Sequence, residues 1–369
     1  HVPGEQYAVC AVRFKRSAQS GVVRETRVVG VARHGAGRDA KRLGAREPRS
    51  LRAIAHHHRD VGANPTGEAA LGDGEHVAAC AAMGASMTGA RTMLVMKHVG
   101  LNIAADPLNY VGYAGIKGGM LIVVGTDPGA NSSTGEEDVH WYAKQFNLPL
   151  FEPTSPQALY DCCQDGFALS EELGLPILIF VTGLICHQST RVQTHPHTPV
   201  KRAYYFEKDR DRYINVGQRA VQNHRLLLEK MAAYAQTHAF FKVDGPSNAP
   251  LAVITRGNTT LHFAEIQTYI PQLANCTWIQ LNGVYPLPSN ALLPLLQDKT
   301  EIIVMEDQDG FVEYLLKMEM YNVLNAKIQG KNLFPAYGEL RINELLEILC
   351  AYFGVAYPFE GLPSLPIPE

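Results

Sequence analysis

The sequence has few of the features by which secreted, membrane or metal proteins are usually recognised. Its seven cysteines, at positions 10, 80, 162, 163, 186, 276 and 350, are odd in number and include no CxxC spacing. This pattern indicates neither a disulfide framework nor an iron–sulfur or zinc site, and it favours a reducing, cytoplasmic setting. The longest apolar runs, 177–181 and 120–124, are strand-sized, so we expect no membrane association and no signal peptide.

Glycine-rich phosphate loops are also absent. GIKGG (115–119) and GTDPG (125–129) match neither GxGxxG nor GxxxxGK, which disfavours a nucleotide-dependent dehydrogenase or a kinase. The histidine triplet at 56–58 points three ways on any regular element, and His195 and His197 have no third ligand nearby. We therefore predict no metal site in this chain.

Charge is unevenly distributed along the sequence. Residues 1–60 hold 13 Lys and Arg against five Asp and Glu, a net of +8, whereas the whole chain carries −3. A shifted reading frame in GC-rich DNA, a divergent domain start and a nucleic-acid-binding arm are three readings of this segment. It has no aromatic interleaving after Phe14 and no sustained period, so we expect no nucleic-acid partner and no compact fold for 1–66 as written.

From residue 67 onward, short apolar strands alternate with helical segments. Continuous apolar runs are typical of parallel strands that are buried on both faces. The expected strands are TMLVMK (92–97), GMLIVVG (119–125), LPLFEP (148–153) and LPILIFVTG (175–183). The expected helices include a small-residue helix at 75–90, one that starts within STGEED (133–138), and one that starts at Pro156 with Ser155 as its cap.

This alternation is interrupted between 184 and 247. A polar stretch is followed there by a long helix at about 216–236, and a second series of strands and helices occupies 248–355 before a proline-rich tail at 356–369. The predicted fold class is therefore α/β, with two open parallel-sheet domains (67–183 and 248–355) joined by a helical linker.

Polar side chains gather where the expected strands of the first domain end. Open α/β sheets bind ligands at the carboxyl ends of their strands, although ordinary capping and turn chemistry would use the same residue types. The candidates are Lys97, His98, Asn102, Asp127, Asn131, Ser132 and Ser133.

Several extended strings resemble one protein family. MKHVGLNIAADPL (96–108), GGMLIVVGTDPGANSS (118–133) and SPQALYD (155–161) resemble the pyrimidine-binding domain of 2-oxoacid:ferredoxin oxidoreductases, most nearly the indolepyruvate ferredoxin oxidoreductase α subunit. NGVYPLP (282–288) and IIVMEDQDGFVE (302–313) resemble the transketolase C-terminal-like domain of that family.

The resemblance implies chemistry that the spacing of residues cannot give. It implies thiamine diphosphate, bound between a pyrimidine domain and a separate pyrophosphate domain that holds Mg²⁺. The implied reaction is oxidative decarboxylation of an aryl pyruvate, such as indolepyruvate, to acyl-CoA and CO₂. Coenzyme A is the implied cosubstrate, and electrons pass through iron–sulfur clusters on another domain or subunit to ferredoxin.

The resemblance also assigns residues. In the family, a glutamate in a string of the form NEKVA hydrogen-bonds N1′ of the aminopyrimidine. GEHVA occupies that place here, so Glu75 is the catalytic candidate. A solvated glutamate in the first turn of a helix is the structural alternative. The resemblance further places Lys97, His98 and Asn102 beside the cofactor, and Asp127, Asn131, Ser132 and Ser133 in the substrate pocket.

The sequence departs from the family at both ends. No GYPGTPSSE-like turn precedes Glu75, and no CxxCxxCxxxC motif is present. We therefore expect the chain, as a natural split subunit or as a fragment, to work in a multimer. The expected partners are a pyrophosphate-domain subunit or a missing C-terminal domain, a β/γ subunit and a ferredoxin-type iron–sulfur protein. The rival interpretation is a non-catalytic α/β scaffold or binding subunit of such a complex.

Overall fold

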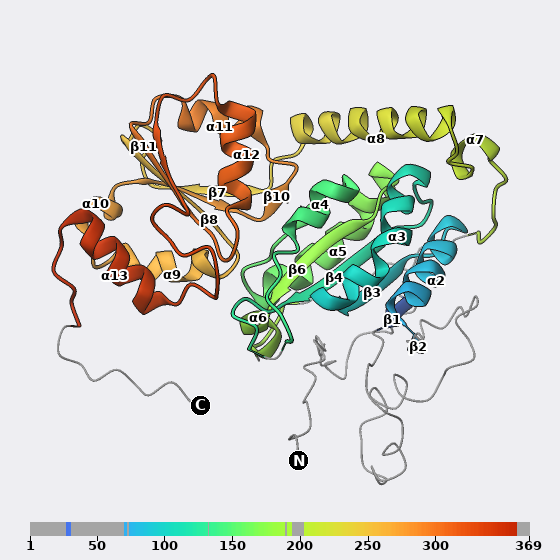
Figure 1. Ribbon diagram of the computed structural model, residues 1–369, viewed down its shortest axis with the longest axis horizontal. Helices are drawn as coiled ribbons and strands as arrows, with labels where there is room; N and C mark the ends of the chain where they lie inside the picture. Colours follow the sequence, from blue (N-terminus) through green and yellow to red (C-terminus); the bar gives the residue numbers. More distant parts are fainter. Residues whose placement is uncertain are drawn as a thin grey trace, which may run out of the picture. The chain divides into compact units, whose positions relative to one another are not determined.

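A computed structural model describes the chain at residues 27–30, 70–71, 74–131, 133–188, 190–193 and 203–359. The described residues up to Ala239, together with Gly283–Pro288, form one compact unit. Phe240–Asn282 and the described residues from Ser289 onward form a second. In each unit helices pack on a mostly parallel sheet (Figure 1), so the predicted α/β fold class is confirmed.

The sheet of the first unit has the strand order β10-β5-β6-β4-β3-β1-β2. Every neighbouring pair is parallel except β10 and β5. The strands are β1 (Arg27–Gly30), β2 (Ala70–Leu71), β3 (Thr92–Lys97), β4 (Met120–Thr126), β5 (Leu150–Phe151), β6 (Ile177–Thr182) and β10 (Gly283–Tyr285).

Both faces of this sheet are covered. Leu121 and Val123 of β4 belong to a core cluster with residues of α5, whereas the alternate residues Ile122 and Val124 are equally buried on the other face. Burial on both faces explains why β4 and β6 read as continuous apolar runs. The helices are α2 (Glu75–Met87), α3 (His98–Ala114), α4 (His140–Phe146), α5 (Pro156–Leu173), α6 (Gly183–His187), α7 (Arg210–Tyr213) and α8 (Gln218–Thr237).

Local signals placed most of these boundaries correctly, with one clear exception. Ser155 caps α5 as predicted, because its hydroxyl accepts a hydrogen bond from the Ala158 N–H at 3.1 Å. The helix expected to start within 133–138 starts instead at His140. Glu137 bonds to Asn102, whereas the Asp138 carboxylate accepts the N–H of His140 at 3.0 Å, so the acids precede the helix and the predicted start is wrong by about one turn.

A strand from the arginine-rich segment joins the first sheet. Val28 and Val29 of β1 pair in parallel with Met93 and Leu94 of β3. The expectation that residues 1–66 stay outside the fold is therefore wrong for Arg27–Gly30. The rest of that segment lies outside the described residues.

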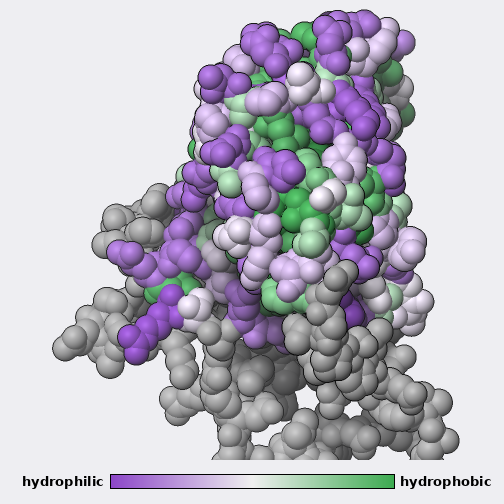
Figure 2. Space-filling view, turned by 90° about the vertical axis from the view of Figure 1, so that its left-hand side faces the viewer, coloured by the Kyte–Doolittle hydropathy of each residue, from purple (hydrophilic) through white to green (hydrophobic). Residues whose placement is uncertain are grey.

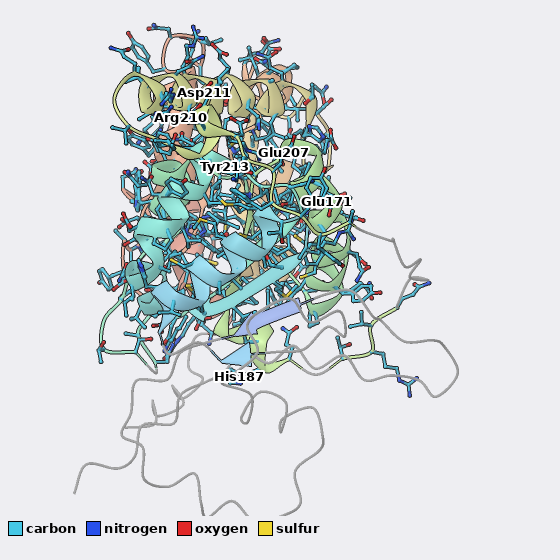
Figure 3. All side chains as sticks on the ribbon, turned by 90° about the vertical axis from the view of Figure 1, so that its right-hand side faces the viewer. Glu171, His187, Glu207, Arg210, Asp211 and Tyr213 are labelled. Carbon is cyan, nitrogen blue, oxygen red and sulfur yellow. The ribbon has the colours of Figure 1, made fainter. Side chains whose placement is uncertain are left out.

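The described part of the linker packs along the first unit. The Tyr205 N–H donates to the Thr88 carbonyl at 3.0 Å, and Arg212 donates to the carbonyls of Ala114 and Ile116 at 2.6 and 2.8 Å. Figure 3 shows α7, which carries the labelled Arg210, Asp211 and Tyr213, on this side of the unit. The long helix α8 follows and belongs to the first unit, so the second unit begins at Phe240 and not at the predicted residue 248.

The second unit has a five-stranded sheet of order β12-β11-β8-β9-β7, in which only β7 is antiparallel to its neighbour. Its strands are β7 (Phe241–Asp244), β8 (Leu251–Arg256), β9 (Thr277–Leu281), β11 (Glu301–Met305) and β12 (Lys327–Gln329). Its helices are α9 (Asn258–Ile266), α10 (Pro271–Ala274), α11 (Ser289–Leu296), α12 (Phe311–Met320) and α13 (Ile342–Phe353).

Buried charged groups at the carboxyl ends of β8 and β11 are paired with one another. Arg256 Nε lies 2.9 Å from Glu306 Oε2, and both side chains are almost fully buried. The Glu306 carboxylate also accepts the N–H groups of Val312 and Glu313 in the first turn of α12, at 2.9 and 3.0 Å. Asp307 accepts the Leu340 N–H at 2.8 Å. This network satisfies its charges internally and joins α12 to the sheet.

The face formed by α10 and α13, at the left of Figure 1, is turned toward the viewer in Figure 2. Hydrophobic residues there form small groups between hydrophilic ones. Tyr269 and Phe359 are partly exposed and contact each other, with ring centroids 5.5 Å apart. Such scattered apolar exposure is ordinary for a folded domain. Among the described residues, no helix is both long and apolar enough to cross a membrane.

The cysteines of the described residues are mostly free thiols. Cys80, Cys162, Cys163, Cys276 and Cys350 are unbonded. Burial raises the pKa of the Cys162 thiol and raises that of Cys163 to about 12. These two thiols therefore stay protonated and serve packing, not nucleophilic chemistry.

Candidate functional site

The candidate residues of the first unit lie at the carboxyl edge of its parallel sheet. α2 follows β2, α3 follows β3 and the loop that begins at Asp127 follows β4. Because β3 and β4 are parallel and in register up to Lys97 and Gly125, Lys97 and Asp127 leave the sheet side by side. This is the edge at which open α/β sheets bind ligands.

Glu75 is the first residue of α2, and its side chain lies across the first turn of α3. A Cβ atom built on Gly100 would be 2.7 Å from Glu75 Cγ and 3.0 Å from Glu75 Oε1. The side chain is half-buried and has no hydrogen bond or ion pair with any described residue. The carboxylate is therefore held in place by packing and remains available to a hydrogen-bond donor.

His98, the first residue of α3, is 1% exposed. Neither ring nitrogen has a hydrogen-bond partner among the described residues. A buried polar group without a partner costs about 1–3 kcal/mol, so such groups usually mark a site where a missing ligand or water belongs. His98 and the Glu75 carboxylate thus share the first turn of α3, and both lack a partner there.

The second group of predicted residues forms a connected cluster. Lys97 Nζ lies 3.5 Å from Asp127 Oδ2, and the Ser133 hydroxyl donates to the same oxygen at 2.5 Å. The turn between them includes Ala130 at a φ of 50°, and the Ala130 N–H donates to the Asp127 carbonyl at 3.0 Å. The cluster combines one cation and one hydroxyl around a single carboxylate at the strand ends.

Asn102 lies one turn further along α3 and is already engaged. Its amide NH₂ donates to both carboxylate oxygens of Glu137, at 2.9 and 2.8 Å, and its carbonyl oxygen accepts a hydrogen bond from the Tyr142 hydroxyl. Burial, and secondarily the nearby Glu137 charge, raise the pKa of Tyr142. These contacts tie the loop before α4 to α3.

A buried acid–histidine–acid network holds the end of the same loop. His140 Nδ1 lies 2.5 Å from Asp138 Oδ1, and His140 Nε2 lies 3.1 Å from Glu152 Oε2. All three side chains are at most 4% exposed, and the His140 ring meets Phe180 edge-on at 5.1 Å. Because both ring nitrogens face carboxylates, the network links the start of α4 to the residue that follows β5.

The structure therefore brings some predicted residues together and leaves others apart. Glu75 and His98 share the first turn of α3, and Lys97, Asp127 and Ser133 form one cluster. Asn131 is exposed and bonds within its own loop, to the Pro128 carbonyl at 3.1 Å. Ser132 lies outside the described residues.

Sequence reasoning missed two groups near this edge: the Glu137–Tyr142 pair that holds Asn102, and the network around His140. The signal that could have found them is the acidic run at 136–138, which was interpreted as the first turn of a helix. Within the described ranges, no group of three or more His, Cys, Asp or Glu residues is arranged to hold a metal ion.

Comparison with known proteins places this edge in a wider context. Residues 50–245 match the family described as pyruvate flavodoxin/ferredoxin oxidoreductase, thiamine diphosphate-binding. The indolepyruvate oxidoreductase subunit IorA of Pyrococcus horikoshii is 29% identical over 293 residues, which are 77% of this chain and 45% of that protein. The Archaeoglobus fulgidus subunit of the same name is 32% identical over 262 residues, 68% of this chain and 41% of that protein.

A solved structure shares the fold. The 2-oxoglutarate:ferredoxin oxidoreductase from Magnetococcus marinus superposes with a TM-score of 0.60 at 13% identity, covering 89% of this chain and 62% of that chain. This chain spans less than half the length of the two IorA relatives. The matched family model extends over more than half of the sequence, from before β2 to just past β7. The chain belongs to the thiamine diphosphate-binding family of pyruvate flavodoxin/ferredoxin oxidoreductases.

Proposed function

We propose that this chain supplies the pyrimidine-binding part of a thiamine-diphosphate-dependent 2-oxoacid:ferredoxin oxidoreductase. The substrate class proposed is an aryl pyruvate such as indolepyruvate, oxidised to an acyl-CoA and CO₂. The names of the IorA relatives, at 29–32% identity, support that substrate class.

The observation that carries the proposal is the first turn of α3. The half-buried side chain of Glu75 packs over Gly100, and the fully buried imidazole of His98 begins the same turn; neither has a hydrogen-bond partner among the described residues. An aminopyrimidine ring offers both donors and acceptors, so it fits a site lined by a carboxylate and an imidazole. The residues present therefore suit the group that the family binds.

In this proposal the Glu75 carboxylate would accept a charge-assisted hydrogen bond from the pyrimidine ring, and the strength of that bond would depend on the carboxylate keeping its position over the first turn of α3. The buried His98 would offer a ring nitrogen to the same group. Thiamine diphosphate, when bound, supplies the electron sink for decarboxylation.

Lys97, Asp127 and Ser133 would line the substrate side of the site. The Lys97 ammonium is partly neutralised by Asp127 at 3.5 Å, so a 2-oxoacid carboxylate would compete with Asp127 for it. Asn131 and Ser132 are proposed for the same pocket on the resemblance alone. Asn102 would contact the cofactor only after release from Glu137, because its amide and carbonyl are both engaged.

The remaining functions are proposed to lie outside this chain. A pyrophosphate-binding domain with Mg²⁺, iron–sulfur clusters and a β/γ subunit would complete the complex, with coenzyme A as cosubstrate and ferredoxin as electron acceptor. The cytoplasm is the proposed location and a multimer the proposed assembly.

The test is the hydrogen–deuterium exchange rate at C2 of thiamine diphosphate bound to the reconstituted complex, followed by NMR. Glu75→Gln should slow exchange by about 10²- to 10⁴-fold, the usual contribution of a proton-transfer group. The amide is nearly isosteric, so folding should be unchanged. Glu229→Gln, the same change on the exposed face of α8, is the matched control and should leave the rate unaltered.

Equal exchange rates in Glu75→Gln and the wild-type protein would remove Glu75 from the chemistry. The non-catalytic scaffold interpretation would then gain support. It predicts in addition that no 2-oxoacid drives viologen reduction with any pyrophosphate-domain partner, although the chain folds normally.

A further inference from the structure

We propose that Gly100 is a positioning residue. Because it has no side chain, it leaves a space, here called the seat, that the Glu75 side chain occupies. The inference depends on the proposed function for its catalytic meaning. It adds a second residue, on another helix, that decides where the catalytic carboxylate lies.

The seat is visible in the packing of α2 against α3. A Cβ atom on Gly100 would lie 2.7 Å from Glu75 Cγ, 3.0 Å from Oε1 and 3.2 Å from Cδ. The first distance is shorter than side chains tolerate. All three nearest atoms belong to the Glu75 side chain, so a methyl group at position 100 would displace that side chain and leave the backbone of α3 in place.

Two other helical glycines differ from Gly100 in what an added Cβ would meet. At Gly112, on the same helix, an added Cβ would meet the Phe146 carbonyl oxygen at 2.9 Å, so backbone would have to move. At Gly84, within α2, nothing lies within 4 Å of an added Cβ. The Gly100 contact differs from both, because it falls on a flexible side chain that has a proposed chemical role.

Glycine is a poor residue for the interior of a helix, since alanine loses less conformational entropy there. Gly84 therefore reports the gain in helix stability that alanine gives where there is free space. If the space at Gly100 is needed by Glu75, Gly100→Ala should stabilise the chain less than Gly84→Ala while Glu75 is present. Once Glu75 is shortened to alanine, the two substitutions should stabilise the chain equally.

The first experiment measures urea-unfolding midpoints of the full chain for Gly84→Ala and for Gly100→Ala, each made in the wild-type, Glu75→Ala and Glu75→Gln backgrounds, together with the three parent proteins. We expect Gly100→Ala to raise the midpoint less than Gly84→Ala in the wild-type and Glu75→Gln backgrounds. In the Glu75→Ala background we expect the two increments to match. If Gly100→Ala changed the urea midpoint by the same amount in all three backgrounds, the proposal would be wrong.

The Glu75→Gln background has a separate purpose. Glutamine has the shape of glutamate without its charge, so a steric seat predicts the same coupling for both. Coupling that vanishes with glutamine would mean that charge and not shape links the two positions, which contradicts the proposal. Gly112→Ala should lower the midpoint in every background, because its contact is with backbone.

The second experiment measures C2 hydrogen–deuterium exchange in the reconstituted complex with thiamine diphosphate and Mg²⁺. A shift of about 1 Å in a catalytic group can cost about 10²-fold, so Gly100→Ala should slow exchange by about 10- to 100-fold. It should cause no further slowing in the Glu75→Gln background. Equal slowing in both backgrounds would show that Gly100 does not act through Glu75 and would overturn the proposal.

The two experiments separate the inference from the function on which it rests. If the midpoints show the expected coupling but Glu75→Gln exchanges at the wild-type rate, the proposed function fails and only the steric contact survives. If Glu75→Gln is slow and the midpoints show no coupling, the function stands and the positioning role of Gly100 fails.

Discussion

The two sheets of this protein treat polar groups at their carboxyl edges in opposite ways. In the second unit, Arg256 and Glu306 are buried and paired at 2.9 Å, and Glu306 also accepts two backbone N–H groups of α12. In the first unit, Glu75 packs over Gly100 of α3 and His98 begins the same helix, and neither has a partner among the described residues. The same position in an open sheet thus carries a satisfied network in one case and an unsatisfied pair in the other.

The difference separates structural polar groups from functional ones. A buried charge with a full set of partners stabilises the packing around it, whereas a buried polar group without partners destabilises the chain until a ligand arrives. Gln308 is the exception in the second unit: it has a φ of 55°, and its buried side-chain NH₂ lacks a partner among the residues described. Substitutions at the two edges should therefore change the free energy of unfolding in opposite directions.

The largest effect is expected at the satisfied edge. Arg256→Met removes the cation and leaves the Glu306 carboxylate uncompensated in the core, which typically costs about 3–5 kcal/mol of unfolding free energy. Urea unfolding of the full chain, followed by circular dichroism, measures this. The matched control is Arg225→Met on α8, whose exposed pair with Glu229 at 3.7 Å should contribute about 0–1 kcal/mol. Similar costs at the two positions would show that the network does not stabilise the second unit.

A smaller effect of the opposite sign is expected at the unsatisfied edge. His98→Leu replaces a buried imidazole that has no described partner with an apolar side chain of similar size. Removing such a group should stabilise the chain by about 1–3 kcal/mol, because its desolvation cost disappears. The same urea titration measures it. A loss of stability would mean that His98 has hydrogen-bond partners in the folded chain. The two edges would then no longer differ in this respect.

The smallest effect concerns pH and tests the second unit away from its network. Burial lowers the pKa of His262 on α9, and Glu265 offsets this in part. The unfolded chain then binds the proton more readily than the folded one, so stability is present above the unfolded pKa and is lost as pH falls below about 6.5. His262→Gln should reduce the fall in melting temperature between pH 7.5 and 5.

Glu265→Gln provides the matched control for that measurement. It removes the group that partly restores the His262 pKa, so the fall in melting temperature should become larger. A fall that is the same in the wild-type protein and in both variants would show that His262 does not couple stability to pH.

Much of the fold followed from local sequence signals. TMLVMK was predicted as a strand and forms β3 (Thr92–Lys97), and Ser155-Pro156 was predicted to open α5 and does so. These signals act over a few residues, where capping and hydrophobic patterning decide the outcome. The rule that ligands bind at strand ends likewise selected Lys97 and Asp127. In the structure Lys97 Nζ lies 3.5 Å from Asp127 Oδ2.

Contacts between distant segments could not be predicted in the same way. The Glu137–Asn102 pair depends on the path of an irregular loop, whereas Glu137 was predicted to lie in the first turn of a helix. The pairing of β10 with β5 joins residues more than a hundred positions apart, and no local signal in 283–285 specifies it. Non-local pairing of this kind is set by the packing of the whole unit.

The strand β10 belongs to the sheet of the first unit, although the residues on both sides of 283–288 belong to the second unit. The chain leaves the second unit after Asn282, adds Gly283–Tyr285 to the edge of the first sheet and returns at Ser289. A gene fragment that stopped at residue 247 would encode a first unit whose β5 edge is open to pairing with other chains. Recombination could exchange the second unit cleanly only with crossovers on both sides of this insertion. The two units are therefore expected to be inherited as a pair, even though each has its own sheet.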